Sequence, residues 1–457
     1  MSVALAGQPV VPLGSRTHPP GLWTLAATEV WDRASFYGMQ ALLILYMTQY
    51  LLLPGAVDTV IGLGALKSAI ASVRGPLSIE GQATQIFALY IAVLSLLPLL
   101  GGWLGDRFIA RRTGVVAGAA LMCAGHLALG LTSTFLIGLL LVLAGAGLLR
   151  GNIAPQIRAL YAAEDPRTAE AFQIYYLTVT IGGFLSPLVT GIVSERYGFH
   201  PAFAIAAIGM LIGLVWYVAR MKTLPPDPPR AVRGAARIPL SDKEKRNVVV
   251  LTVFLVVPLT FWIAQVQIWN IYNIWVSERV DRMVGGFSVP VPWLQSLDSL
   301  APMAMAIAAI FYWRRGAPRV EHYGRMAAGC ILFGLGMLIL AAAPAIAGHE
   351  TAIPILIPVA FHIVSNLGWV LFAPTCAAFI ADYAPERWRG TMLGFNILTT
   401  SVAGFLSGPL SSLYEARGPT YFWAVIAIVP IAGGTGLILA KPLLRRQLSA
   451  VGTPQST

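Results

Sequence analysis

The most constraining feature of the sequence is a group of charged residues inside its first long apolar stretch, in the run EVWDRASFYGMQALLILYM. Glu29, Asp32 and Arg33 are spaced by three and four residues, so they share one helical face and can pair with one another. Ionisable groups inside a membrane segment are costly and usually mark an ion or substrate path. We therefore interpret the cluster as functional. The alternative is an interfacial cluster at the mouth of the helix, held only by water and lipid headgroups.

The composition is that of a polytopic membrane protein. Hydrophobic residues make up 57% of the chain and charged residues 11%, whereas soluble domains carry about 25% charged residues. The net charge of +11 is explained by basic cytoplasmic loops. Because no basic run is interleaved with aromatic residues, we expect a lipid bilayer and no nucleic acid among the partners. Cys123, Cys330 and Cys376 stand alone in apolar stretches, which predicts buried thiols and no metal site.

Stretches long enough to cross a bilayer, which requires about 20 mostly apolar residues, recur along the whole chain. They predict an all-α membrane protein with twelve transmembrane helices in two six-helix bundles. The predicted helices cover residues 22–52, 84–105, 113–132, 134–157, 170–193, 200–220, 247–276, 292–313, 324–346, 352–380, 391–415 and 420–441.

Basic residues are concentrated in alternate connections and in the C-terminal tail, which predicts that both termini are cytoplasmic. The proline-rich, basic segment 223–246 is the clearest boundary and predicts a cytoplasmic linker. It divides the chain into an N-terminal bundle, 1–222, and a C-terminal bundle with a short tail, 247–457. In transporters built from two such halves, the substrate site lies near the membrane midplane between them.

The segment GGWLGDRFIARR (101–112) resembles the signature loop of the major facilitator superfamily, a glycine-rich turn followed by Asp-Arg and a basic pair. Its glycines allow two helices to approach closely. The resemblance implies a conformational latch that stabilises one state of alternating access. The predicted latch residues are Gly102, Asp106, Arg107, Arg111 and Arg112.

Three segments of the N-terminal half resemble motifs of the proton-dependent oligopeptide transporter family. Residues 29–38 match the spacing of the signature E-x-x-E-R-F-x-Y-Y-G, with Asp32 in place of the second glutamate. The segment GAGLLRGNI (145–153) is similar to the family's helix-4 segment, with Arg150 where lysine is usual. The segment YYLTVTIG (175–182) is similar to the helix-5 motif, with threonine in place of asparagine.

The C-terminal half resembles the same family but departs from it at acidic positions. In FWIAQVQ (261–267) Val266 occupies the position of a glutamate, and in NLGWVLFAP (366–374) Trp369 occupies the position of another. WLQSLDS (293–299) resembles the helix-8 segment, with Asp298 for asparagine. PERWRGTMLGFNIL (385–398) matches the loop between helices 10 and 11, with Asn396 where an aromatic residue is common.

The resemblance implies the major facilitator fold and a symporter that works by alternating access, with protons as the coupling ion and no other cofactor. The implied substrate is a di- or tripeptide or a peptide-like carboxylate, whose anionic end Arg33 and Arg150 would hold. Proton coupling is assigned to Glu29, Asp32, Arg33 and Arg150. Substrate binding is assigned to Arg33, Tyr37, Arg150, Tyr175, Tyr176, Gln267, Asp298, Trp369 and Asn396.

Because the sequence differs from the family motifs at these positions, the identity of the substrate stays open. Arginine at position 150 cannot serve as a neutral base, because a guanidinium does not lose its proton in proteins. Trp369 attracts a cation only through its ring face, by about 0.5–2 kcal/mol. Asp298 either replaces the missing partner of a substrate amine or is paired within the protein. His126 and His362 are expected to be hydrogen-bonded packing residues.

Two other functions remain open. One is import or export of a non-peptide amphipathic compound on the same scaffold, favoured by the lost acids and by Trp369. The other is a non-transporting sensor or an intramembrane enzyme. The sequence has no phosphate-binding loop and no catalytic triad or zinc signature, so we expect neither an ATP-driven pump nor an enzyme. A monomer in a bacterial inner membrane fits the compact chain.

Overall fold

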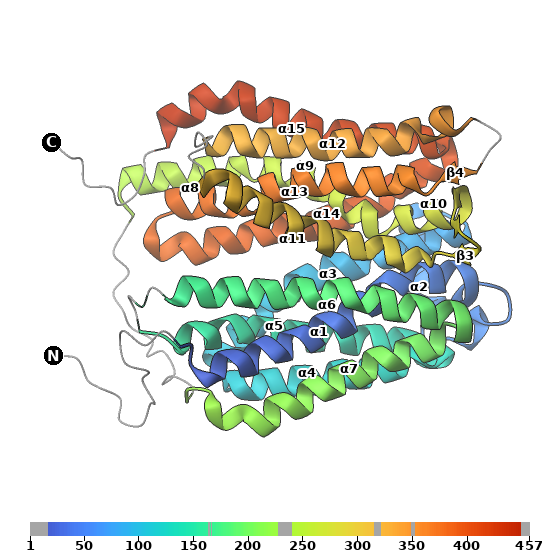
Figure 1. The fold of residues 1–457 in the computed structure, drawn as a ribbon, viewed down its shortest axis with the longest axis horizontal. Coiled ribbons are helices and arrows are strands. Elements are labelled where there is room, and N and C mark those ends of the chain that lie inside the picture. Colours follow the sequence, from blue (N-terminus) through green and yellow to red (C-terminus); the bar gives the residue numbers. More distant parts are fainter. Residues whose placement is uncertain are drawn as a thin grey trace. The chain divides into compact units, whose positions relative to one another are not determined.

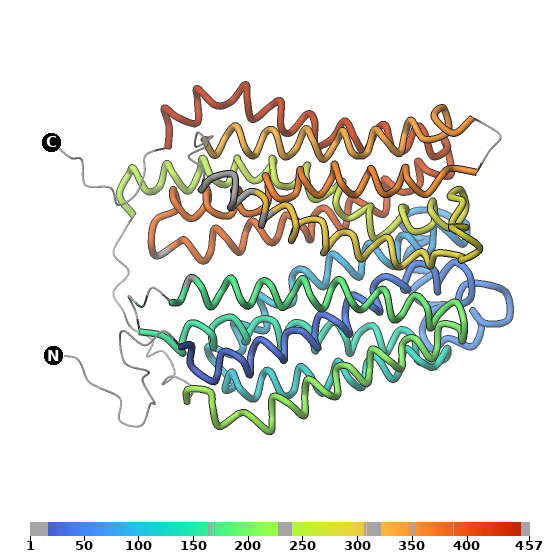
Figure 2. Tube along the Cα trace, viewed as in Figure 1, coloured from blue at the N-terminus to red at the C-terminus, as the bar shows by residue number. Residues whose placement is uncertain are grey.

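The computed structural model describes residues 17–162, 165, 167–226, 240–314, 321–348 and 352–448. These residues form an all-α structure, as predicted, and within each part of the chain the long helices run roughly alongside one another (Figures 1 and 2). The long helices are α1 (Pro20–Tyr46), α3 (Ile79–Arg107), α4 (Arg111–Leu129), α5 (Phe135–Ala159), α6 (Arg167–Tyr197), α7 (Phe199–Arg220), α11 (Val291–Arg314), α12 (His322–Ala347), α13 (Leu356–Tyr383), α14 (Arg389–Arg417) and α15 (Pro419–Gln447).

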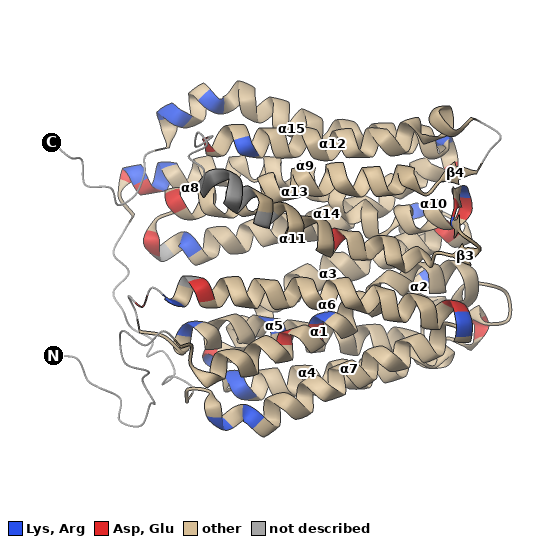
Figure 3. Ribbon diagram, viewed as in Figure 1, with Lys and Arg blue, Asp and Glu red and all other residues tan. Residues whose placement is uncertain are grey.

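Ten helical stretches among the described residues are long and apolar enough to cross a membrane. Helix α1 is not among them, although its 27 residues are sufficient for a span. Every 18-residue segment of α1 contains Glu29, Asp32 and Arg33, so composition alone does not mark α1 as a span. Figure 3 shows that charged residues gather near helix ends and that few lie along the middle of a helix.

One predicted helix is broken. The stretch 247–276 is divided into α8 (Asp242–Phe254), α9 (Val256–Trp269) and α10 (Ile271–Arg279). Pro258 has no N–H to donate to the carbonyl of Phe254, four residues before it, and α8 ends at that residue. The second break is at Asn270, whose φ of −104° and ψ of −102° are not helical.

Several short elements were not predicted because none is long enough to span a bilayer. They are the helix α2 (Leu63–Arg74) and the strands β1 (Val280–Asp281), β2 (Met283–Val284), β3 (Phe287–Ser288) and β4 (Ile353–Pro354). Strand β1 pairs in parallel with β4, and β2 pairs with β3 in an antiparallel hairpin. Gly285 and Gly286 form that hairpin's turn with φ of +58° and +82°, a conformation that favours glycine.

The chain forms two compact units, which we describe separately. Unit 1 comprises residues 1–40, 59–62 and 97–233, and unit 2 comprises residues 41–58, 63–96 and 234–457. Residues 227–239 of the predicted linker lie outside the described residues, so the predicted division at 223–246 stays a prediction.

Glycines bring neighbouring helices into backbone contact within each unit. In unit 1, a Cβ on Gly145 of α5 would lie 2.5 Å from the carbonyl oxygen of Gly118 on α4, and the converse distance is 2.6 Å. In unit 2, Gly329 of α12 and Gly368 of α13 face each other in the same way, at 2.7 and 2.6 Å. Small residues allow membrane helices to pack this closely, and apolar burial from water does not drive the association.

We predict that Gly145→Ala destabilises the protein, because the added methyl group must push α4 and α5 apart at a cost of about 1–3 kcal/mol. Gly436 on α15 is the matched control, since no atom lies within 4 Å of a Cβ placed there. Gly436→Ala should leave the thermal midpoint unchanged or raise it. Thermal unfolding of the purified variants in detergent measures both, and equal midpoints would refute the packing argument.

Candidate functional site

The charged residues of α1 form a bonded cluster with Arg150 of α5 in unit 1. The Nε of Arg33 donates to Oε1 of Glu29 at 2.7 Å, one helical turn away. The Nε of Arg150 donates to Oδ2 of Asp32 at 3.1 Å, and the Nε of Arg33 lies 3.7 Å from the same oxygen. Asp32 therefore interacts with both guanidiniums, and we call these four residues the α1–α5 charge cluster.

The α1–α5 charge cluster is buried, so the interfacial alternative does not describe it. The side chains of Glu29 and Asp32 are 0% exposed, and those of Arg33 and Arg150 are 16% and 11% exposed. Two anions and two cations balance, which is the condition under which buried charges are tolerated. The hydrogen bonds of the cluster are incomplete, because Oδ1 of Asp32 and Nη2 of Arg150 are buried and have no hydrogen-bond partner among the described residues.

Aromatic side chains surround the charge cluster. The guanidinium of Arg150 lies over the ring of Phe36, 4.0 Å from its centre, which adds a cation–π interaction. Tyr37 and Tyr175 are half-buried and lie near Arg33. Tyr176 differs, because it is 66% exposed and packs edge-on against Tyr175 at 6.5 Å.

The predicted latch residues lie at the end of α3 and the start of α4, on either side of the short connection 108–110, so the glycines expected in a turn are helical. The Nη2 of Arg111 donates to Oδ1 of Asp106 at 2.8 Å, and Arg112 donates to the carbonyl oxygen of Leu224. The guanidinium of Arg107 lies 5.5 Å from the centre of the Trp103 ring.

Glycines hold the latch segment against α5. A Cβ on Gly102 would lie 3.2 Å from the carbonyl oxygen of Gly151. The side-chain amide of Asn152 donates to the carbonyl oxygen of Gly101 at 3.0 Å. The segment that resembles the superfamily loop therefore contacts the same turn of α5 that carries Arg150.

Unit 2 contains a second buried polar group, around Asp298 of α11. The Oδ1 of Asp298 lies 2.8 Å from Nδ1 of His362 on α13 and accepts from the amide of Asn366 at 3.2 Å. The Nε2 of His362 lies 2.8 Å from the hydroxyl of Tyr272 on α10. His362 and Tyr272 are 0% exposed. We call Asp298, His362 and Tyr272 the carboxylate–imidazole–phenol chain.

Two sequence expectations about these residues have clear outcomes. Asp298 is paired within the protein, which was one of its two open interpretations. His362 is a hydrogen-bonded residue, as expected. His126 is a buried packing residue, as expected, but neither of its ring nitrogens has a hydrogen-bond partner among the residues that the structure describes. Sequence reasoning missed Tyr272 altogether, because a lone tyrosine among apolar residues carries no signal of its partner.

The other predicted residues of unit 2 occupy different positions. Gln267 is fully buried between α9 and α14, where its amide donates to the carbonyl oxygen of Ser407 and its oxygen accepts from Ser411, both at 3.3 Å. Asn396 on α14 accepts from the thiol of Cys376 at 3.7 Å. The structure therefore gives both amides partners within the protein.

Trp369 remains half-buried on α13. It follows His362 by seven residues and Asn366 by three, so the three side chains share one face of the helix. The position at which the family carries an acid therefore lies on the face of α13 that presents the carboxylate–imidazole–phenol chain.

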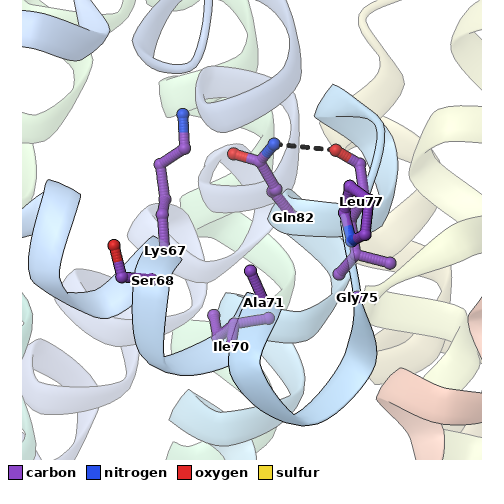
Figure 4. A pocket seen from close by; sticks show the side chains of 8 residues that line it. Lys67, Ser68, Ile70, Ala71, Gly75, Leu77 and Gln82 are labelled. Atoms are coloured by element: carbon purple, nitrogen blue, oxygen red, sulfur yellow. Dashed lines mark hydrogen bonds between the residues drawn. The ribbon is translucent and has the colours of Figure 1, made fainter.

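A small cavity of about 240 Å³ lies at α2 in unit 2 and contains none of the predicted site residues (Figure 4). Lys67 is its charged residue, and Gln82 donates to the carbonyl oxygen of Leu77 at 2.9 Å beside it. We assign it no role in the site.

Comparison with known proteins gives a consistent result. The sequence profile described as the Major Facilitator Superfamily matches residues 41–409. An uncharacterized transporter of Bacillus subtilis is 27% identical, over 95% of this chain and 96% of its own length. A di-/tripeptide transporter of Lactococcus lactis subsp. cremoris is 25% identical, over 94% of this chain and 96% of its own length.

Solved structures with the same fold are peptide transporters of the family that the motifs resemble. A mutant peptide transporter in complex with sulfate superimposes with a TM-score of 0.83 at 23% identity, over 96% of this chain and 98% of that one. A transporter of the same family in complex with 5-aminolevulinic acid gives a TM-score of 0.79 at 22% identity, over 94% of this chain and 98% of that one. The predicted fold and the family resemblance are confirmed.

We predict that the contact between Asp32 and Arg150 stabilises the folded protein, so the losses of unfolding free energy on replacing the two residues are not additive. Asp32→Asn and Arg150→Gln should each lower the unfolding free energy by about 3–5 kcal/mol, because each leaves the buried cluster with one uncompensated charge. The double variant should lose less than the sum of the two. Thermal unfolding in detergent measures the three variants, with the exposed pair of Asp242 and Lys245 as the control. Strictly additive losses would contradict the pairing.

Proposed function

This chain belongs to the major facilitator superfamily of membrane transporters, and from that premise we propose that it is a proton-coupled symporter for peptides or peptide-like carboxylates. The observation that carries the proposal is the buried α1–α5 charge cluster, with two acids and two guanidiniums in contact inside unit 1. A transporter that belongs to this superfamily moves its substrate without chemical conversion, so the protein is not an enzyme. The relatives named as peptide transporters support the substrate class.

The guanidiniums of the cluster are suited to hold a substrate carboxylate. Arg150 has one buried nitrogen with no hydrogen-bond partner in the described part of the chain, and Arg33 is partly exposed. A planar guanidinium binds a carboxylate through two parallel hydrogen bonds, which gives geometric selectivity as well as affinity. We infer that the anionic end of the substrate binds at Arg33 and Arg150, in competition with Asp32.

The carboxylates of the cluster are the proton acceptors, because arginine stays charged. Protonation of Asp32 removes the charge that both guanidiniums share and frees them for a substrate carboxylate. Proton binding and substrate binding then favour the same state, which is the thermodynamic requirement for symport. Release of the proton restores the bond between Asp32 and Arg150 and expels the substrate.

Transport of a non-peptide amphipathic compound is the second candidate. Val266 is 5% exposed and Trp369 is half-buried, so the two positions that carry glutamate in the family present apolar surface here. A substrate without an amine loses nothing by these changes. We propose that the protein works as a monomer with cytoplasmic termini in a bacterial inner membrane.

We predict uncoupler-sensitive accumulation of labelled dipeptides in proteoliposomes with an inward acid gradient. A gradient of about one pH unit supports about tenfold accumulation for each coupled proton. Protein-free liposomes and a collapsed gradient are the controls. If folded, reconstituted protein accumulates no dipeptide, the peptide assignment fails and a ligand screen of amphipathic carboxylates follows.

We also predict that Asp32→Asn and Glu29→Gln abolish accumulation but leave exchange of substrate across the membrane. The amides keep the shape of the side chain and remove the site that binds the proton. Counterflow at equal pH on both sides measures exchange separately from coupling. Accumulation by both variants at the level of the unmodified protein would refute the assignment of the coupling residues.

A further inference from the structure

The carboxylate–imidazole–phenol chain of unit 2 differs from the α1–α5 charge cluster in its charge balance. Asp298 is 8% exposed at its side chain, and His362 is 0% exposed. With Asp298 ionised and His362 neutral, the group carries one uncompensated negative charge. A buried charge without a counter-charge costs several kcal/mol, so one further ion would relieve the site.

The cations of the helices that supply this chain lie at helix ends. Within the described part of the sequence, α13 carries no Lys or Arg, and Arg279 and Arg314 are the last residues of α10 and α11. Helices α8, α12 and α14, which also pack on α13, carry their charged residues within five residues of a helix end. Tyr272 is the titratable side chain that faces His362 from α10, and Asn366 is the polar one on α13.

From this imbalance, and resting on the proposed function, we propose that Asp298 and His362 together bind one proton in unit 2, and that this proton reverses the hydrogen bond between His362 and Tyr272. The bound proton makes the group neutral overall. The site is a second proton-binding site, separate from the carboxylates of the α1–α5 charge cluster.

The reversal follows from the chemistry of imidazole. Without the added proton, Nδ1 of His362 donates to Asp298, so Nε2 must accept from the hydroxyl of Tyr272. With the proton on His362, both ring nitrogens are donors and Nε2 donates to Tyr272. With the proton on Asp298 instead, the carboxylic acid donates to Nδ1, the imidazole adopts the other tautomer, and Nε2 again donates to Tyr272. Nε2 thus gains a proton in either case.

The position of Tyr272 gives this reversal a structural consequence. Tyr272 is the second residue of α10 and follows the break at Asn270 that separates α10 from α9. The ring of Tyr272 also packs on Trp275 and Phe361, at centroid distances of 6.1 and 5.2 Å. The proton on the Asp298–His362 pair therefore alters the bond that anchors the start of α10 to α13.

The first test needs no substrate. The full-length protein is prepared with nitrogen-labelled histidine, and the ring signals of its six histidines are followed by NMR between about pH 5 and pH 8. His362→Gln identifies the His362 signals by their loss. We expect Nε2 of His362 to change from an unprotonated to a protonated nitrogen as the pH falls. A ring that keeps one tautomer and one protonation state over this range overturns the proposal, even if transport is proton-driven.

The second test is transport in proteoliposomes. Asp298→Asn and His362→Gln should lower proton-driven accumulation about tenfold for a gradient of about one pH unit, and His362→Gln should retain counterflow exchange. The control is His322→Gln, since His322 lies 3.8 Å from Asp382 in a solvent-exposed pair of the same two residue types. Accumulation by both site variants equal to that of His322→Gln overturns the proposal. If the unmodified protein accumulates no dipeptide, the proposed function fails, and the NMR titration alone decides on the proton site.

Discussion

Charge inside a membrane helix has to be neutralised by the protein itself, and the helices of both units are arranged to meet this requirement. In unit 1 the carboxylates of α1 are bonded to guanidiniums from α1 and α5, so four ionised side chains form a neutral group. In unit 2 a single carboxylate is paired with one imidazole, and this pair is neutral only with one proton more than an ionised carboxylate and a neutral imidazole carry. One group is neutral without a proton and the other becomes neutral by binding one.

Close packing makes this neutralisation geometrically possible. Side chains as short as aspartate reach another helix only if the backbones approach, and glycines provide that approach. Gly182 of α6 is an example, because a Cβ there would lie 2.7 Å from the carbonyl oxygen of Val30 on α1. The glycine-rich motifs and the charged motifs of the sequence are therefore parts of one structural arrangement.

Patterns within one helix could be predicted from the sequence, and contacts between helices could not. The spacing of Glu29, Asp32 and Arg33 predicted a shared face, and the structure bonds Glu29 to Arg33 within it. Arg150 joined the site only through the family resemblance, because no local rule links residues more than a hundred positions apart. The break at Asn270 carries no proline or glycine signal and depends on its tertiary surroundings.

Tyr176 and Gln267, which were predicted to bind substrate, have other surroundings in the structure, because contacts between helices could not be predicted from the sequence. Tyr176 follows Tyr175 by one residue, and this step of about 100° on a helix carries it away from the partners of Tyr175. Gln267 occupies a position that matches a family motif, but its amide is hydrogen-bonded to Ser407 and Ser411. A motif assigns a residue to a helix, whereas the neighbouring helices decide which partner it meets.

A single turn of α5 contacts both the charged residues of α1 and the latch segment. Arg150 bonds to Asp32, Gly151 packs on Gly102, and Asn152 bonds to the carbonyl oxygen of Gly101. The three residues are consecutive. A rotation or a shift of this turn that frees the guanidinium of Arg150 must therefore also disturb the contacts of Gly151 and Asn152 with the latch segment. Three consecutive residues of α5 thus link the ionic state of α1 to the C-terminal part of α3, which leads into α4.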